Sequence, residues 1–148
     1  MKKIVLLVGV LCLAQTMRAQ ILSPVKWSYG AKKTGKGEAV IFIKATIDEG
    51  WHIYSTHEPD GGPVKTSFVF KPAKGYLLNG KIAEPTPLSK YEDAFDITTK
   101  YFAGEVIFQQ KIKLRSAHPI VKGSLKYMVC NDRQCLPPAE VNFEIPIN

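Results

Sequence analysis

The chain has 148 residues, of which 20 are Lys or Arg and 13 are Asp or Glu, and its formal net charge at pH 7 is +7. The basic residues do not alternate with aromatic residues along any one stretch, so the composition argues against a nucleic-acid-binding protein. The length suits one domain that buries its own core without depending on disulfide bonds.

The N-terminus has the pattern of a secretory signal peptide. Two lysines precede an unbroken apolar run at positions 4–13, and small residues follow at Ala14 and Ala19. The run is shorter than the roughly 20 apolar residues that a membrane-spanning helix needs. We therefore predict a signal peptide at residues 1–19, cleaved after Ala19 or alternatively after Ala14, and one exported domain at residues 20–148 with no membrane span.

Removal of the signal peptide changes the charge and the cysteine count. Loss of Lys2, Lys3 and Arg18 leaves 17 basic residues against 13 acidic ones, a net charge of +4. One of the three cysteines lies in the apolar run, so the exported domain keeps Cys130 and Cys135. Disulfides persist in exported proteins, and an even cysteine count at short spacing favours pairing of the two with each other.

The exported domain is predicted to consist of β-strands. Period-two alternation, or a run rich in aromatic and β-branched residues, marks six stretches that glycine and proline clusters separate. In chain order these stretches are 39–48, 51–55, 66–72, 105–114, 124–130 and 140–147. In the fourth stretch, Gln109 and Gln110 interrupt the apolar alternation, which predicts a β-bulge there.

Seven or eight short strands at this spacing indicate an all-β fold, and we predict an immunoglobulin-like antiparallel β-sandwich. The Cys…Trp…Cys spacing of antibody domains is absent, so the likeness to that fold concerns architecture alone. The longest stretch predicted to be irregular is 83–100, which contains two prolines and the aromatic residues Tyr91 and Phe95. Loops of this length in a compact domain are usually functional or disordered.

The stretch CNDRQC (residues 130–135) allows three interpretations. A disulfide that closes so short a loop stabilises a fold by roughly 2 kcal/mol, against over 4 for a loop of about a hundred residues, so a structural staple would be a weak one. A zinc site needs four ligands, usually in paired cysteine units. The chain has one such unit at marginal spacing, and the histidines, including His52 in what is predicted to be an ordinary strand, are scattered.

The third interpretation is thiol–disulfide exchange. That chemistry needs an accessible thiolate and a second cysteine to resolve the mixed disulfide. The tip of a hairpin between residues 124–130 and 140–147 would give the required exposure. Arg133 would favour a thiolate and Asp132 would oppose it. Spacing alone leaves the staple and the exchange interpretation open.

A resemblance favours exchange. LKYMVCNDRQCLPPAEV resembles the cysteine hairpin of the N-terminal periplasmic domain of the transmembrane disulfide reductase DsbD. The family's pattern is a tyrosine, two residues, a cysteine, a short polar loop and then Cys-x-Pro-Pro. The matching residues here are Tyr127, Cys130, Cys135, Pro137 and Pro138, with four residues between the cysteines where the best-known members have five.

Two other stretches are similar to weaker signatures of the same family. DEGWHIYS, at residues 48–55, resembles the family's Asp-Gly-aromatic strand that ends in a tyrosine, here Tyr54. YEDAFD, at residues 91–96, resembles the family's acidic cap loop with its phenylalanine, here Phe95. The likeness covers essentially the whole exported domain.

The resemblance implies an immunoglobulin-like domain in the periplasm, with a Cys130–Cys135 disulfide at one end. Cys135 would form the mixed disulfide with a partner, and Cys130 would resolve it. Phe95 would cover the disulfide as a lid, and the hydroxyl of Tyr54 would hydrogen-bond a sulfur or an acidic group.

The acidic residues of the cap loop depart from the family's pattern. The family places two acidic residues directly before the lid phenylalanine, where they tune the active thiol. In this chain Glu92 and Asp93 are followed by Ala94, so only Asp93 keeps its register.

The resemblance also implies partners. Family members accept electrons from a thioredoxin-like domain and pass them to exported proteins, so thioredoxin-fold proteins are the expected donors and acceptors. The chain ends at Asn148, so a membrane-embedded reductase is expected to be a separate protein. The exchange needs no metal or organic cofactor. The alternative is an exported module that binds a protein or glycan through Trp27, Trp51 and Tyr91 and carries an inert disulfide.

Overall fold

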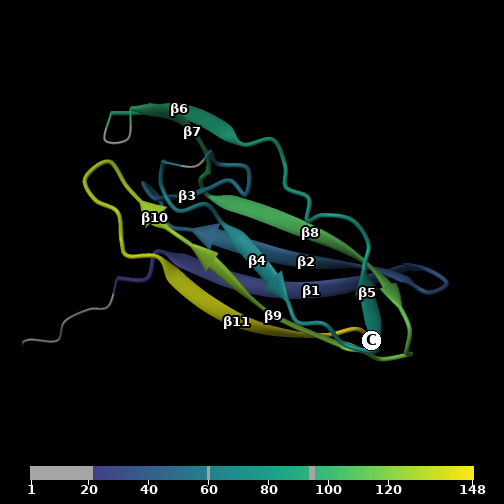
Figure 1. The fold of residues 1–148 in the computed structure, drawn as a ribbon. Coiled ribbons are helices and arrows are strands. Elements are labelled where there is room, and N and C mark those ends of the chain that lie inside the picture. The colour runs from purple at the N-terminus through teal and green to yellow at the C-terminus, as the bar shows by residue number, and fades with distance from the viewer. Residues whose placement is uncertain (1–21, 60, 94–95) are drawn as a thin grey trace, which may run out of the picture.

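The computed structural model describes residues 22–59, 61–93 and 96–148, and the part of the chain that it describes is built from eleven strands without a helix (Figure 1). The strands are β1 (Val25–Gly35), β2 (Glu38–Ile47), β3 (His52–Tyr54), β4 (Ser67–Phe70), β5 (Tyr76–Leu78), β6 (Leu88–Glu92), β7 (Ile97–Phe102), β8 (Glu105–Leu114), β9 (Ile120–Tyr127), β10 (Val129–Cys130) and β11 (Ala139–Pro146). Each of the six stretches predicted as strands overlaps at least one of these strands, and the number of strands exceeds the seven or eight expected.

The strands form three antiparallel sheets. The sheet β1-β2-β8-β5 and the sheet β11-β9-β4 make the two layers of a sandwich, and the sheet β10-β3-β7-β6 lies at one end of it (Figure 1). Strand β10 continues the direction of β9 beyond the second layer and pairs with β3, so it carries Cys130 into the end sheet. The prediction of an all-β antiparallel sandwich is confirmed.

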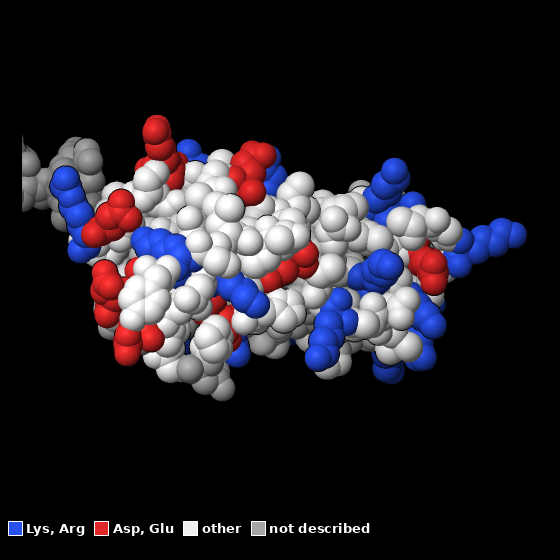
Figure 2. Space-filling view, turned by 90° about the horizontal axis from the view of Figure 1, so that it is seen from above, with Lys and Arg blue, Asp and Glu red and all other residues white. Residues whose placement is uncertain are grey.

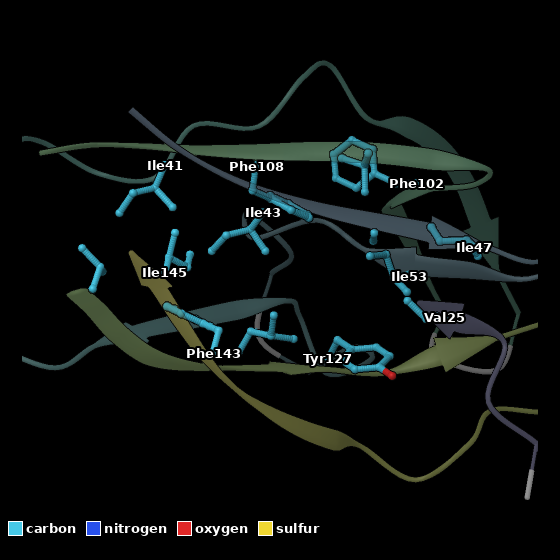
Figure 3. Packing of buried hydrophobic residues seen from close by; sticks show 14 of the residues in the cluster. Val25, Ile41, Ile43, Ile47, Ile53, Phe102, Phe108, Tyr127, Phe143 and Ile145 are labelled. Carbon is cyan, nitrogen blue, oxygen red and sulfur yellow. The ribbon is translucent and has the colours of Figure 1, made fainter. Parts of the chain in front are cut away.

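Alternating side chains of the two layers meet in one core (Figure 3). Period two sends every second residue of a strand to the same face, and burial of those residues removes their apolar surface from water at about 25 cal/mol per Å². Core residues of the first layer include Ile41, Ile43, Val106, Phe108 and Ile112, and those of the second include Val121, Leu125, Phe143 and Ile145.

The predicted bulge at Gln109 and Gln110 is wrong. Strands β2 and β8 pair without a break from Glu38↔Lys113 to Thr46↔Glu105. Gln110 keeps its place on the core face and is 2% exposed, and its side-chain amide donates to the carbonyl oxygens of Gly80 and Lys111. The polar residue is tolerated in the core because its donors are satisfied.

The stretch 83–100 was predicted to be irregular, and this prediction is wrong for much of it. Residues Leu88–Glu92 and Ile97–Phe102 form the hairpin β6–β7, paired from Leu88↔Tyr101 to Glu92↔Ile97. Its strands mix polar and apolar residues on both faces, so they lack the regular apolar alternation that marks the core strands. The hydroxyl of buried Thr99 donates to the carbonyl of Lys90 and holds the two strands together.

Charge is distributed unevenly along the sandwich. Figure 2 shows Lys and Arg side chains predominating toward the end formed by the β1–β2 turn, while most of the acidic side chains lie toward the opposite end. The basic end brings together Lys33 near the end of β1, Lys36 in the β1–β2 turn, Lys74 before β5, Lys113 near the end of β8, and Arg115 directly after it.

Candidate functional site

The two cysteines form a disulfide that closes a tight four-residue loop at the end of β10. Cys130 and Cys135 are bonded at an S–S distance of 2.02 Å, and their Cα atoms are 4.0 Å apart. The side-chain oxygen of Asn131 accepts hydrogen bonds from the backbone N–H groups of Arg133 and Gln134, each at 2.9 Å. This Asx turn is a conformation that asparagine favours, and it fixes the loop from within.

The two sulfur-bearing residues differ in exposure. Cys130 is 2% exposed, whereas Cys135 belongs to the exposed residues. A cavity of about 450 Å³ opens beside them, lined by the disulfide loop, Tyr54 and residues 90–93 of the β6–β7 hairpin. An incoming group therefore reaches Cys135 before Cys130.

Strand β3 places a histidine and a tyrosine next to the disulfide. His52 pairs directly with Cys130, and Tyr54, two residues further, lies on the same face of the strand. The Nε2 atom of His52 and the hydroxyl of Tyr54 are 3.2 Å apart. Both residues are buried, His52 at 6% and Tyr54 at 1% exposure, and the His52 ring also contacts the ring of Tyr101 edge-on.

Charged side chains connect the β6–β7 hairpin to the disulfide loop. The Nζ atom of Lys90 lies 3.4 Å from Glu92 Oε1 and 3.4 Å from Asp132 Oδ1. Glu92 Oε1 also lies 3.6 Å from His52 Nε2. Asp132 is thus held by a lysine of the neighbouring hairpin, while Arg133 borders the cavity.

The described residues on either side of the cap-loop tip are held to each other. The hydroxyl of Tyr91 donates to a carboxylate oxygen of Asp96, and the backbone N–H of Asp96 donates to the carbonyl of Glu92 at 2.9 Å. Asp96 has a φ of 56°, in the left-handed region that aspartate adopts more readily than most residues. These contacts turn the chain sharply between β6 and β7 beside the cavity.

Comparison with known proteins assigns the chain to a family. The model of the family described as thiol:disulfide interchange protein DsbD, N-terminal, matches residues 18–146. The chain belongs to the DsbD N-terminal domain family. No curated protein matches the chain.

Solved structures of the DsbD N-terminal type share the fold. The N-terminal domain of DsbD from Neisseria meningitidis in the reduced form matches with a TM-score of 0.59 and 19% identity, over 86% of this chain and 91% of that one. The DsbD N-terminal domain in its complex with the PilB N-terminal domain, also from N. meningitidis, matches with a TM-score of 0.56 and 16% identity, over 84% and 87%.

A longer relative matches over part of its length. The N-terminal periplasmic domain of ScsB from Proteus mirabilis gives a TM-score of 0.62 and 18% identity, over 86% of this chain. This chain covers 48% of that structure, so it spans about half of the ScsB domain.

The structure brings most of the predicted site residues of this DsbD N-terminal domain together. Cys130, Cys135, Tyr54, Glu92 and Asp93 all border the cavity beside the disulfide. Phe95, the predicted lid, and Ala94 before it lie outside the described residues.

Two residues of the site were missed by sequence reasoning. His52 was interpreted as an ordinary strand residue, and Lys90 was not singled out. The spacing of two between His52 and Tyr54 was an available signal, because it puts both side chains on one face. Lys90 offered no signal, because its role depends on the β6–β7 hairpin lying against the disulfide loop.

Burial and nearby charges shift the pKa values of the site. Burial, followed by the charges of Glu92 and Glu58, holds the pKa of Tyr54 far above its usual value, so its hydroxyl stays protonated. Burial, followed by the charge of Lys90, lowers the pKa of His52, while Glu92 and Asp132 oppose that shift. The imidazole is therefore neutral at pH 7, and the site holds a buried neutral base.

Within the described ranges, no three His, Cys, Asp or Glu residues come together as a metal site would require. The same ranges contain no helix of the length and apolar character needed to cross a membrane.

Proposed function

We propose that this domain exchanges thiols and disulfides in the periplasm, relaying electrons from a thioredoxin-like donor to exported acceptor proteins through Cys130 and Cys135. The observation that carries the proposal is the unequal burial of the two sulfurs in a member of a thiol:disulfide interchange family. Exchange requires one sulfur that a partner reaches and a second that is held ready to displace it.

In this mechanism the reduced domain attacks first through Cys135. Its thiolate attacks a sulfur of the partner's disulfide, which forms a mixed disulfide and releases the other partner sulfur as a thiolate. Cys130 then attacks the Cys135 sulfur, which closes the Cys130–Cys135 disulfide and releases the partner with two reduced sulfurs. Two electrons pass from the domain to the partner, and a thioredoxin-like donor restores the dithiol by the reverse steps.

The other predicted site residues have supporting roles in the proposal. Phe95 covers the disulfide until a partner displaces the cap loop. Asp93 and Glu92 supply negative charge that tunes the attacking thiol, and the hydroxyl of Tyr54 hydrogen-bonds a sulfur or an acidic group. Glu92 and Asp93 line the cavity beside the disulfide, which supports this assignment.

The proposal extends to export and partners. Residues 1–19 form a signal peptide, and residues 20–148 form the exported domain. The partners, both donor and acceptors, are thioredoxin-fold proteins. The structure of a DsbD N-terminal domain in complex with the PilB N-terminal domain supports the view that domains of this fold dock onto a protein partner.

The decisive experiment combines a reduction potential with mixed-disulfide capture. We expect a potential near the thioredoxin value of about −270 mV. The Cys130→Ser variant is expected to accumulate a mixed disulfide with thioredoxin-fold proteins, because Cys135 still attacks and nothing resolves the product. The matched Cys135→Ser variant is expected to capture none, because its remaining sulfur is buried.

The opposite result would identify a structural staple in an exported binding module. That result is a potential well below about −300 mV together with no thioredoxin-fold protein captured by Cys130→Ser.

A further inference from the structure

The exchange mechanism leaves one proton without a destination. Cys130 must lose its proton to attack the mixed disulfide, since the thiolate is the nucleophile. A free thiol has a pKa of about 8.5, and burial raises it. Cys130 is 2% exposed, so water is a poor acceptor for that proton and a base inside the site is needed.

His52 is placed to meet that need. It is the direct cross-strand partner of Cys130 between β3 and β10. Residues directly opposite each other in an antiparallel pair project to the same face, with Cβ atoms about 4.5–5.5 Å apart. The imidazole and the Cys130 side chain therefore lie side by side on the face that also carries Tyr54.

The Tyr54 hydroxyl connects the imidazole to the cavity. It lies 3.2 Å from His52 Nε2, and Tyr54 lines the cavity together with both cysteines. The direction of this hydrogen bond depends on the imidazole tautomer: with the imidazole proton on Nδ1, the protonated phenol donates to Nε2. A proton given to the hydroxyl oxygen can thus be passed to Nε2.

The groups around His52 suit a base that becomes protonated briefly. The charged and titratable neighbours are Lys90 and Glu92 on β6, Asp132 in the disulfide loop, and Tyr101 on β7. Among the residues described, Glu92 Oε1 is buried without a hydrogen bond, and it lies 3.4 Å from the Nζ of Lys90 and 3.6 Å from His52 Nε2. A protonated imidazole would give this oxygen a hydrogen-bond donor and a second positive charge beside that of Lys90, while burial and the charge of Lys90 keep the resting imidazole neutral.

We propose that His52 receives the Cys130 proton through the Tyr54 hydroxyl when Cys130 attacks the mixed disulfide. The inference rests on the proposed exchange function. The Cys130 proton moves to the Tyr54 oxygen as the Tyr54 proton moves to His52 Nε2, and the Cys130 electron pair forms the new S–S bond with Cys135. The imidazolium then gives its proton to solvent or to the released partner thiolate. In the reverse direction it protonates Cys130 as the disulfide opens.

A small aromatic disulfide, 5,5′-dithiobis(2-nitrobenzoate), separates the two attacks without a protein partner. Attack by Cys135 releases one coloured thiolate, and attack by Cys130 on the resulting mixed disulfide releases a second one. The chain is used with Cys12→Ser, so that only the pair reacts. The fast phase then reports Cys135, and the slow phase reports Cys130.

The informative variant is His52→Gln, whose amide oxygen still accepts the Tyr54 hydroxyl but cannot take up a proton. We expect the slow phase at pH 7 to fall about tenfold or more, as loss of a general base does, with the fast phase unchanged within about twofold. The pH at half-maximal slow-phase rate is expected to lie below 6.5 in the parent and to move to about 8.5 or above in the variant. His118→Gln, on an exposed loop at the other end, is the matched control and should change neither phase.

Tyr54→Phe provides an independent test of the relay. It should slow the same phase selectively, because the proton then has no path to Nε2.

A normal slow phase in Tyr54→Phe would overturn the relay, and a normal slow phase with an unmoved pH profile in His52→Gln would overturn the role of His52 altogether. An equal loss of both phases would also contradict it, because that loss would mean a general disturbance of the site. Failure of the proposed function would appear differently, as a disulfide in the parent protein that thioredoxin does not reduce.

Discussion

Glu84 anchors the chain where it leaves β3, directly after the strand that carries His52 and Tyr54. Its carboxylate accepts hydrogen bonds from the hydroxyl of Ser55, from the backbone N–H of Thr56 at 2.9 Å, and from His57 Nδ1 at 2.9 Å. The Glu84 side chain is only 6% exposed. Burial on its own would raise the pKa of Glu84, but these hydrogen bonds outweigh it and hold the pKa below its usual value.

We expect Glu84→Gln to lower the free energy of unfolding by about 1.5–3 kcal/mol at pH 7, the usual contribution of hydrogen bonds to a charged group. A carboxylate with a depressed pKa stabilises the fold above its unfolded pKa of about 4.5, and this stabilisation is lost as the pH falls through the folded value. The difference between variant and parent should therefore shrink at pH 3.5 in urea unfolding. Equal differences at both pH values would contradict this account, and exposed Glu140→Gln is the control.

At the residue scale, the part of the site that depends on chain-local spacing could be predicted. The two cysteines, Tyr54 and the acidic pair of the cap loop all lie in short stretches that the family resemblance covers. The ion pair of Lys90 with Asp132 could not be predicted, because it joins residues 42 positions apart. His52 was visible in the sequence but had no assigned role until its pairing with Cys130 was known.

Among the elements, the packing of strand β9 between its two neighbours depends on a single glycine, Gly123. Strand β9 is the middle strand of its sheet, and Gly123 pairs with Phe70 on one side and with Phe143 on the other. A Cβ at this position would lie 2.3 Å from the carbonyl oxygen of Val69 and 2.5 Å from Cζ of Phe143. The ring centroids of Phe70 and Phe143 are 5.6 Å apart, so the rings are packed across the glycine.

Gly123→Ala is expected to lower the free energy of unfolding by about 1–3 kcal/mol, because the methyl group must displace backbone or a packed ring. Gly30→Ala in β1 is the matched control, since a Cβ there meets nothing within 4 Å. That variant should be neutral or stabilising by up to about 1 kcal/mol, as removing a strand glycine usually is. Similar losses in both variants would show that packing around Gly123 is not the cause.

The strands that could be predicted are those with one apolar face. Strands β2, β8 and β11 alternate clearly, and their bounds differ from the prediction by at most one residue at each end. The hairpin β6–β7 was missed because its pairing is satisfied by backbone and polar contacts, with few apolar side chains to mark it. The predicted bulge was wrong for the opposite reason, since Gln110 occupies a core position in an unbroken ladder.

Across the whole molecule, the end with the disulfide is less basic than the net charge implies. The domain from residue 20 onward carries +4, yet the cavity rim holds Glu92, Asp93 and Asp132 against Lys90 and Arg133. The sequence does not reveal this separation, because the basic end gathers lysines from strand ends that are far apart in the chain.

The local field should therefore select cationic over anionic reagents, although the net charge predicts the reverse. We expect the reduced domain to react faster with the cationic disulfide cystamine than with anionic oxidised glutathione, relative to the same ratio for a free thiol. Raising the ionic strength from about 0.01 M to 1 M shortens the Debye length from about 30 to 3 Å, so this preference should shrink by about threefold. A preference for glutathione that salt removes would show that net charge dominates.

The unequal burial of the two cysteines also limits how long an unproductive mixed disulfide at Cys135 lasts. A stray thiol or a wrong partner adds to the exposed Cys135, and Cys130 is tied to the same loop at a fixed short distance. Tethered groups face each other at effective concentrations of at least about millimolar even on flexible linkers, so expulsion of the adduct does not wait for an outside reductant. Each blocked molecule thus carries its own means of release, and the lifetime of an adduct is set within the domain.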